Sequence, residues 1–171
     1  MSISEQVLEK LGNGFSISRM TEHDLLEVVE IEEDSGLSRW GWAAYYAELQ
    51  GSNRDLMLVA RAPKSKAPRV SHTLAGYIVA RIGANELHIN NVAVRERYRR
   101  QGIGLNLLDR ILEEGRSRGV EAAFLELRAG NTAALSLYEK CGFTLTSRRK
   151  RYYSEPPEDA LVMTIQLDRK A

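Results

Sequence analysis

Apolar and polar residues recur with two different periods along the chain, and these periods predict a mixture of strands and helices. Alternating positions predict a strand over residues 15–20. Further runs bounded by glycine, proline or polar residues predict strands over residues 55–61, 73–82, 86–94, 122–129, 143–153 and 160–167. The run at 122–129 is nearly continuous in apolar residues, which predicts a strand buried on both faces.

Apolar residues at helical spacing predict four helices within residues 21–141. At the first of them, Thr21 is a candidate N-cap with Asp24 three residues later. The others are indicated by the apolar residues spaced over 43–49, 103–112 and 135–141. An additional short amphipathic helix is expected within residues 1–14, ended by Gly12-Asn13-Gly14.

The order of these elements indicates the fold class. Strands and helices alternate in the second half of the chain, as in a mixed sheet that carries helices on both faces. A hairpin through residues 83–85 is expected to join the third and fourth strands. We therefore expect a single α/β domain over residues 15–171, preceded by a helical extension at 1–14.

Composition and charge exclude several classes of function. Hydrophobic residues make up 43% of the chain and charged residues 27%, as in ordinary globular domains. The formal net charge of +1 provides no field that would attract nucleic acid or membrane to the whole surface, so any anion site must be local. Cys141 is the sole cysteine, which excludes an intramolecular disulfide and favours a reducing compartment. With no apolar stretch of signal-peptide or membrane-span length, a cytoplasmic protein is expected.

The segment RRQGIGLNLL, residues 99–108, is a candidate anion site. Glycines let the backbone approach a ligand closely, and the first amides of the helix that follows have no partner within the helix. The helix dipole and the two arginines add positive potential. Taken by itself, the segment is explained equally well by a plain glycine turn with solvated arginines. Leu107 stands where a dinucleotide fingerprint needs its third glycine, and the Gly-Lys-Ser/Thr of a Walker A loop is absent.

Three segments together resemble the GCN5-related N-acetyltransferases (GNAT family): RYRRQGIGLNLL, FLELRAGNTAALSLYEKCGF and RRKRYYSEPPEDALVM. Within that family they are similar to the RimI-type ribosomal-protein alanine N-acetyltransferases. The resemblance covers about residues 15–167 and is densest over 91–163. It implies a sheet splayed between its fourth and fifth strands, with acetyl-CoA in the opening and no metal.

The resemblance also implies which residues hold acetyl-CoA. Loop amides would bind the pyrophosphate, and one strand would pair with the pantetheine amides. These residues are Arg99, Arg100, Gln101, Gly102, Ile103, Gly104 and Leu105 in the loop, Val92, Ala93 and Val94 in the strand, and Asn131. Structural roles explain the same residues equally well: the strand fits a buried strand of the sheet, and Asn131 fits an ordinary N-cap. In each case the structural role and the cofactor role are compatible.

Two residues are candidates for proton transfer. Glu126 lies in an apolar strand, where an unpaired carboxylate is costly, so it is either ion-paired, with Arg128 nearby in sequence, or functional. The resemblance implies that Glu126 is the general base, acting through water. It also implies that the Tyr138 hydroxyl protonates the leaving thiolate, although periodicity alone fits a core aromatic. Cys141 is expected to be a buried helix residue, because the family transfers acetyl directly.

The acceptor site is expected in the loop around residues 38–42 and between the last two strands. Its candidates are Arg39, Trp40, Trp42, Tyr152 and Tyr153, although Trp42 fits a core position equally well. An α-amine titrates near 7.7–8.0 and a lysine near 10.4, which favours an N-terminal amine. The RimI-type pattern implies the N-terminal alanine of a ribosomal protein.

Other substrates and other functions stay open. The N-terminal extension, the basic loop at 62–71, and Arg39 where the family usually has proline depart from the pattern. A lysine or a small amine is therefore an alternative acceptor, and a non-catalytic acetyl-CoA-binding module is an alternative from another class. The run Arg148-Arg149-Lys150-Arg151 raises nucleic-acid binding, but a solvated strand edge is the favoured interpretation.

Overall fold

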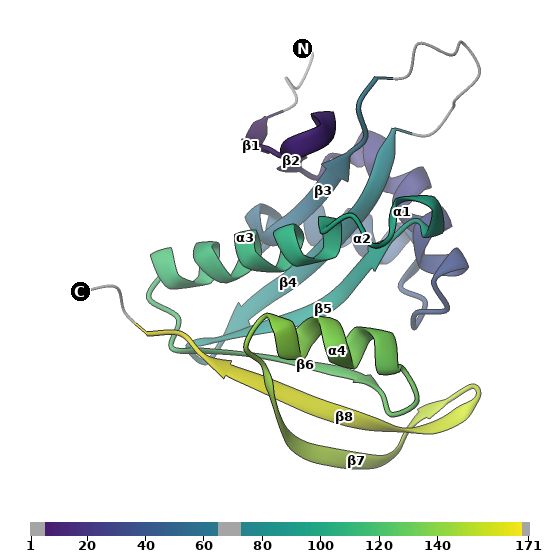
Figure 1. Ribbon diagram of the computed structural model, residues 1–171, viewed down its shortest axis with the longest axis vertical. Helices are drawn as coiled ribbons and strands as arrows, with labels where there is room; N and C mark the ends of the chain where they lie inside the picture. Colours follow the sequence, from purple (N-terminus) through teal and green to yellow (C-terminus); the bar gives the residue numbers. More distant parts are fainter. Residues whose placement is uncertain (1–5, 65–72, 169–171) are drawn as a thin grey trace. The chain divides into compact units, whose positions relative to one another are not determined.

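Eight strands form one mixed sheet in the computed structural model, which describes residues 6–64 and 73–168. The strands are β1 (Val7–Lys10), β2 (Ser16–Arg19), β3 (Met57–Arg61), β4 (Leu74–Gly83), β5 (Glu86–Val94), β6 (Ala122–Arg128), β7 (Thr144–Ser154) and β8 (Pro157–Gln166). The helices are α1 (Leu25–Asp34), α2 (Gly41–Leu49), α3 (Ile103–Ser117) and α4 (Thr132–Lys140). The strand order is β1-β2-β3-β4-β5-β6-β8-β7 (Figure 1). None of the described helices is both long and apolar enough to span a membrane.

The splayed α/β sheet that the resemblance implies is confirmed. β5 and β6 pair in parallel, and their ladder runs from Glu86–Ala122 to Ile89–Leu125. Both strands continue beyond its end. They correspond to the predicted fourth and fifth strands, because β1 adds a strand ahead of the predicted ones.

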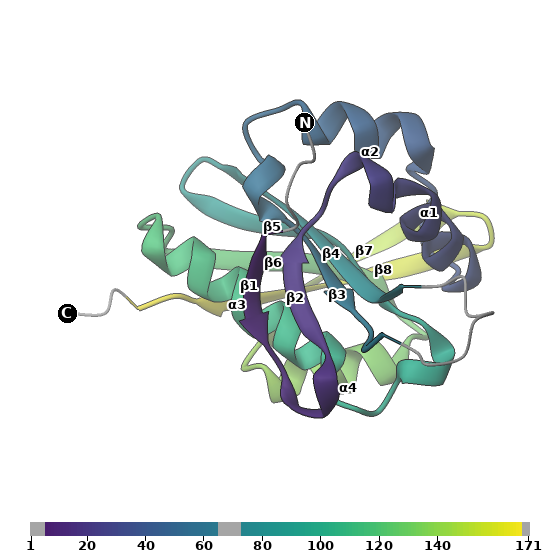
Figure 2. The same cartoon turned by 90° about the horizontal axis from the view of Figure 1, so that it is seen from above.

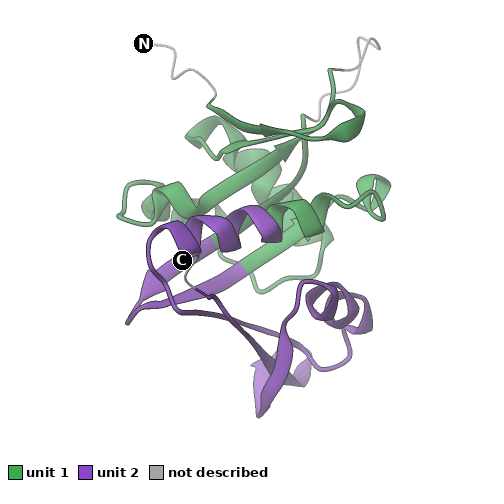
Figure 3. Ribbon diagram, turned by 60° about the vertical axis from the view of Figure 1, so that its left-hand side comes forward, with its two compact units in different colours: residues 1–79, 91–107 green, residues 80–90, 108–171 purple. Residues whose placement is uncertain are grey.

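The chain divides into two compact units (Figure 3). Unit 1 comprises the chain up to Val79 together with Asn91–Leu107, and unit 2 comprises Ala80–Asn90 and Leu108 onward. β4, β5 and α3 therefore contribute residues to both units. The predicted boundary between an extension at 1–14 and a domain at 15–171 stays a prediction.

The predicted N-terminal helix is wrong in the described part of the extension. Residues Val7–Lys10 form β1, which pairs antiparallel with β2, and Gly12–Gly14 form a short 3-10 turn (Figure 2). A helix this short is marginal in water, whereas pairing with β2 satisfies backbone groups on one edge. Residues 1–5 and 65–72, with most of the predicted basic loop, lie outside the described residues.

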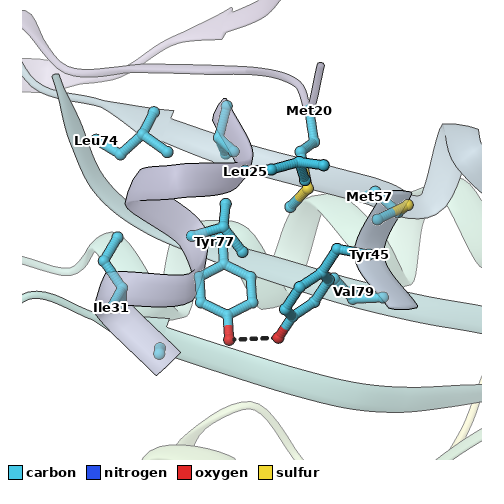
Figure 4. Packing of buried hydrophobic residues seen from close by; sticks show 11 residues of the cluster. Met20, Leu25, Ile31, Tyr45, Met57, Leu74, Tyr77 and Val79 are labelled. Atoms are coloured by element: carbon cyan, nitrogen blue, oxygen red, sulfur yellow. Dashed lines mark hydrogen bonds between the residues drawn. The ribbon is translucent and has the colours of Figure 1, made fainter. Parts of the chain in front are cut away.

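The core of unit 1 is formed where α1 and α2 pack on β3 and β4. Thr21 and Asp24 form the expected capping box, although a 3-10 turn precedes α1. The cluster joins aliphatic side chains to two tyrosines whose hydroxyls face each other (Figure 4). Its members are Met20, Leu25, Val28, Ile31, Tyr45, Met57, Val59, Leu74, Tyr77, Val79 and Ala93.

In unit 2, β6 is buried on one face rather than on both. Ala123, Leu125 and Leu127 are buried, while Phe124 and Glu126 on the other face are only partly buried. The nearly continuous apolar run predicted burial on both faces, but the face with Phe124 and Glu126 stays partly accessible. β7 is exposed along nearly its whole length and ends the sheet, which confirms the interpretation of its basic run as a solvated strand edge.

Gly76 allows β4 and β5 to approach closely in unit 1. A Cβ at this position would lie 2.5 Å from the Ala93 carbonyl oxygen, closer than real side chains approach. A larger residue must therefore displace the backbone around Ala93, within the strand that the resemblance assigns to acetyl-CoA.

We predict that Gly76→Ala lowers the free energy of unfolding by about 1–3 kcal/mol, because a methyl group is forced into a packed site. Gly83→Ala, near the end of the same strand, is the matched control: its Cβ would meet nothing within 4 Å. Denaturant unfolding of both variants measures the difference. Equal midpoints for the two variants would contradict the close approach.

Candidate active site

Glu126 and His88 form a hydrogen-bonded pair on neighbouring strands of unit 2. In the β5–β6 ladder His88 lies opposite Phe124, so Glu126 is its diagonal neighbour on the same face. The His88 ring stacks on Phe124 with centroids 4.4 Å apart and an interplanar angle of 7°. This packing directs His88 Nε2 to Glu126 Oε2 at 2.7 Å.

The surroundings of Glu126 keep its carboxyl group ionised. Its side chain is 11% exposed, and Arg149 Nη2 lies 3.8 Å from Oε1. The hydrogen bond from His88 lowers the pKa of Glu126 below its ordinary value, and this effect outweighs the opposing effect of burial. Arg128, the partner considered from its nearness in sequence, instead contacts Glu158, with Nη1 and Oε1 3.5 Å apart. Glu126 is therefore ion-paired and also accessible to a reactant.

The contacts of His88 indicate which of its ring nitrogens carries the proton. Its side-chain Nδ2 lies 3.3 Å from His88 Nδ1. An amide nitrogen donates, so Nδ1 accepts and the proton of a neutral His88 is on Nε2, facing Glu126. His88 is thus in the tautomer that its hydrogen bond to the Glu126 carboxylate requires.

The predicted tyrosines lie in the same unit and interact electrostatically with Glu126 and with each other. Burial raises the pKa of Tyr138, as does the neighbouring Tyr153, and the side chain is packed against Phe143. Burial and the charge of Glu126 raise the pKa of Tyr153 to about 12. Tyr152 is 50% exposed and meets the Tyr153 ring edge-on at 5.1 Å.

Asn131 and Cys141 lie at the two ends of α4. Asn131 Oδ1 accepts the Ala134 amide proton at 3.1 Å, which confirms it as the N-cap. Cys141 is half-buried rather than fully buried, and burial raises the pKa of its thiol to about 11. A thiol that resists ionisation is a poor nucleophile, in line with the expected structural role.

The glycine loop belongs to unit 1 and has the backbone expected of an anion site. Arg100 and Gly102 both have positive φ, 60° and 78°, and α3 begins directly afterwards at Ile103. The Asn106 amide is bonded to the Gly102 carbonyl, so the amides of residues 103–105 precede the first bond of the helix. Such a helix end can accept a phosphate group.

Arginines beside this loop are held by other groups. Arg99 Nε donates to the Val94 carbonyl at 2.9 Å, and Arg95 Nη2 lies 3.1 Å from a carboxylate oxygen of Glu27. Both arginines line a pocket of about 740 Å³ in unit 1, together with Asp34 of α1. Because carboxylates share this pocket, the positive charge of these two arginines is partly neutralised there.

The candidate acceptor residues are divided between the units, with Tyr152 and Tyr153 in unit 2 and the others in unit 1. The Trp40 ring stacks on Tyr45 with centroids 5.3 Å apart. Trp42 is 44% exposed and stacks on Tyr46, so the alternative of a core position for Trp42 is wrong. Arg39 is exposed.

Sequence reasoning missed His88 and a buried polar group in unit 1, Glu32. No sequence signal pointed to His88, because its place beside Glu126 depends on the register of the β5–β6 ladder. The signal for Glu32 was helical spacing: it lies seven residues after Leu25 and four after Val28, both buried. Within the described residues, no three His, Cys, Asp or Glu side chains are grouped to hold a metal ion.

Comparison with known proteins identifies the family. The sequence pattern of the Acetyltransferase (GNAT) family matches residues 25–143, more than half of the chain. The chain belongs to this family. Its resemblance to that family, first seen in three short segments, is thereby confirmed.

Several relatives of this GNAT chain have names that describe an acceptor. A ribosomal protein bS18-alanine N-acetyltransferase of Escherichia coli strain K12 is 36% identical over 55% of this chain, a match that spans only 65% of that relative. A putative enzyme of the same name from Bacillus subtilis is 31% identical over 90% of this chain and 96% of its own length. The crystal structure of the Escherichia coli ribosomal-protein-S18-alanine N-acetyltransferase matches with a TM-score of 0.75 and 29% identity, covering 92% of this chain and 96% of that one.

We predict that His88→Ala raises the pKa of Glu126, because it removes the largest cause of the lowered value and leaves the effect of burial. The folded-state pKa lies below the unfolded value, so ionised Glu126 stabilises the fold above the unfolded value. This stability is lost as pH falls through the folded value. Carboxyl carbon chemical shifts, followed by NMR during an acid titration, measure the change.

Glu27 is the internal control for that titration. Burial acts to raise its pKa, but hydrogen bonds from Leu74, Thr73 and Arg95 lower it overall. All of these groups belong to unit 1, so the pKa of Glu27 should not respond to His88→Ala. An unchanged Glu126 titration in the variant would contradict the role of His88.

Proposed function

We propose that this protein transfers the acetyl group of acetyl-CoA to the α-amine at the N-terminus of another protein, an N-terminal alanine of a ribosomal protein. The names of the Escherichia coli and Bacillus subtilis relatives support this acceptor. The observation that carries the proposal is the Glu126 carboxylate, ionised and 11% exposed beside His88 in a member of an acetyltransferase family.

The backbone of unit 1 fits acetyl-CoA, which would supply the thioester. Residues 103–105 offer amides that precede the first helical bond, and Gly102 has the positive φ that brings them to the loop surface. Val92, Ala93 and Val94 lie past the end of the β5–β6 ladder, so their strand can pair with the amides of pantetheine. Arg99, Arg100 and Gln101 flank the phosphates. Asn131, in unit 2, keeps its N-cap role and is a further candidate for a cofactor contact.

Glu126 takes the proton from the attacking amine, through a water molecule. A carboxylate with a lowered pKa is fully ionised at neutral pH, so it is always ready to accept a proton, although it is a weak base. The hydrogen bond from His88 Nε2 keeps the carboxylate ionised and orients Oε2, and it is also the reason why the base is weak. An α-amine is partly deprotonated near pH 8, which makes a weak base sufficient.

Tyr138 gives a proton to the departing sulfur. Burial raises the pKa of its phenol, so the group keeps its proton at neutral pH and can donate it. In the balanced reaction a C–N bond forms, the C–S bond breaks, one proton passes from the amine to Glu126 and another passes from Tyr138 to sulfur. Return of the proton from Glu126 to Tyr138 through solvent completes the cycle.

Acceptor specificity rests on the aromatic residues and Arg39. Trp42 and Tyr152 are the exposed aromatics of the two predicted acceptor segments, available to wall a small first side chain. Trp40 and Tyr153 are more enclosed, and Tyr153 contacts the Tyr152 ring. A lysine or small-amine acceptor is the alternative within catalysis.

The first expected result is acetyl-CoA-dependent thiol release with a short peptide beginning with alanine. The same peptide with a blocked N-terminus and a free internal lysine should give no release, because the lysine amine stays protonated at neutral pH. Release with both peptides would indicate a lysine or general amine acetyltransferase. Binding of acetyl-CoA without release from either peptide would indicate the non-catalytic binding module.

We further predict that Glu126→Gln and Tyr138→Phe each lower kcat by about 100-fold or more, as expected for loss of a general base or acid. A glutamine in place of Glu126 keeps the size of the side chain and an oxygen that accepts from His88, so the fold is retained. Glu139→Gln, on the exposed surface of α4, is the matched control. Full turnover in a folded Glu126 or Tyr138 variant would remove that residue from its proposed role.

A further inference from the structure

A buried hydrogen-bond network in unit 1 lies outside the proton-transfer residues. Glu32 on α1, Tyr45 on α2 and Tyr77 on β4 are each 0% exposed, and Asn91 on β5 is 7% exposed. Glu32, Tyr77 and Asn91 all contact the Tyr45 hydroxyl, and its contact with the Tyr77 hydroxyl is drawn in Figure 4. A polar group this deeply buried is costly unless its hydrogen bonds are satisfied.

Glu32 anchors the segment that leads into α2. Its Oε1 accepts the backbone amide protons of Trp40 at 3.0 Å and Gly41 at 3.2 Å. These amides lie at the N-terminus of α2, where the positive end of the helix dipole also favours a carboxylate. Glu32 therefore fixes the backbone between Arg39 and Trp42, two of the candidate acceptor residues.

Tyr45 connects this anchor to β5. Its hydroxyl donates to Glu32 Oε2 and accepts from Asn91 Nδ2 at 2.7 Å. Because its single proton is used on Glu32, Tyr77 must be the donor in the 2.9 Å contact between the two tyrosine hydroxyls. One donor position and two acceptor positions are thus filled, so the Tyr45 hydroxyl is fully satisfied.

Asn91 places the other end of the network beside the candidate cofactor strand. It directly precedes Val92, Ala93 and Val94, whose backbone is the proposed partner of pantetheine. The chain of contacts therefore runs from the amides of the acceptor loop, through one carboxylate and one phenol, to the start of that strand. Hydrophobic residues of similar volume often replace a buried charge without loss of stability, so stability alone does not explain this arrangement.

We propose that Glu32 and Tyr45 are positioning residues for acetyl transfer: they hold the acceptor loop at residues 39–42 in a fixed geometry relative to the part of β5 that begins at Asn91. The inference rests on the proposed function, because it takes these segments as the acceptor and cofactor sites. Neither side chain touches a reacting atom. Their contribution is to keep Trp40 and Gly41 from moving when a peptide binds.

The test is steady-state kinetics of the full chain with a peptide beginning with alanine and with acetyl-CoA, each varied separately. Glu32→Ala should raise the KM for the peptide about tenfold, as expected for one lost charge-assisted hydrogen bond. The KM for acetyl-CoA and kcat should stay within about twofold, because Tyr45, Tyr77 and Asn91 keep their mutual contacts. Rates are referred to the folded fraction measured by circular dichroism.

Glu32→Gln is the conservative rescue. Its amide oxygen can still accept from Trp40 and Gly41, and its nitrogen can donate to the Tyr45 hydroxyl, whose proton then turns to Tyr77. The KM for the peptide should therefore return to within about twofold of wild type. A peptide KM as high as that of the alanine variant would overturn the hydrogen-bond account.

Tyr45→Phe and Tyr77→Phe form a matched pair that does not depend on the alanine variant folding. Removing the Tyr45 hydroxyl breaks the link between Glu32 and Asn91, so the KM values for peptide and acetyl-CoA should both rise. Removing the Tyr77 hydroxyl leaves that link in place, so both values should stay near wild type. Equal kinetics for the two phenylalanine variants would overturn the proposal.

Wild-type turnover, measured first in the same assay, separates the two hypotheses. Absence of acetylation in the wild type contradicts the proposed function itself. Acetylation by the wild type combined with an unchanged peptide KM in folded Glu32→Ala contradicts only the positioning role.

Discussion

A carboxylate removed from water must be given hydrogen-bond donors, and this constraint shapes both units of the chain. Glu32 is fully buried in unit 1 and Glu126 is nearly so in unit 2. Glu32 is surrounded by two backbone amides and a phenol, whereas Glu126 has a histidine and a distant arginine. The first environment leaves the carboxylate no access to a ligand, and the second leaves it some. The difference in access, rather than in charge, suits one residue to positioning and the other to proton transfer.

The hydrogen bond that Glu126 accepts from His88 depends on how the His88 ring is packed. His88 is held flat against Phe124, and Asn90 at the next position of the same strand face lies beside its Nδ1. A neutral histidine donates this hydrogen bond from Nε2 without adding a full positive charge. A lysine or arginine in place of His88 would add that charge and hold the carboxylate in an ion pair.

The sequence predicted those features that depend on residues a few positions apart in the chain. The capping box of Thr21 and Asp24, the cap of Asn131 on α4 and the glycine turn before α3 were all readable from sequence, because each depends on neighbours in the chain. β1 was not, since pairing with β2 overrides the weak helical pattern of residues 7–10. Glu126 was identified as unusual, but its partner His88 lies 38 residues away. Only the register of the β5–β6 ladder brings the two together.

Nearness in sequence does not make Arg128 the partner of Glu126. Arg128 is two residues away on the same strand face, where side chains are separated by about 7 Å along the strand. It stacks over the Tyr153 ring at 4.3 Å and bonds to carbonyls of the β7–β8 turn. Its cation is thus used on Tyr153 and these carbonyls, so it does not compete with His88 for the Glu126 carboxylate. If Arg128 had paired directly with Glu126, the carboxylate would have been bound in a bidentate ion pair and would have been a poorer proton acceptor.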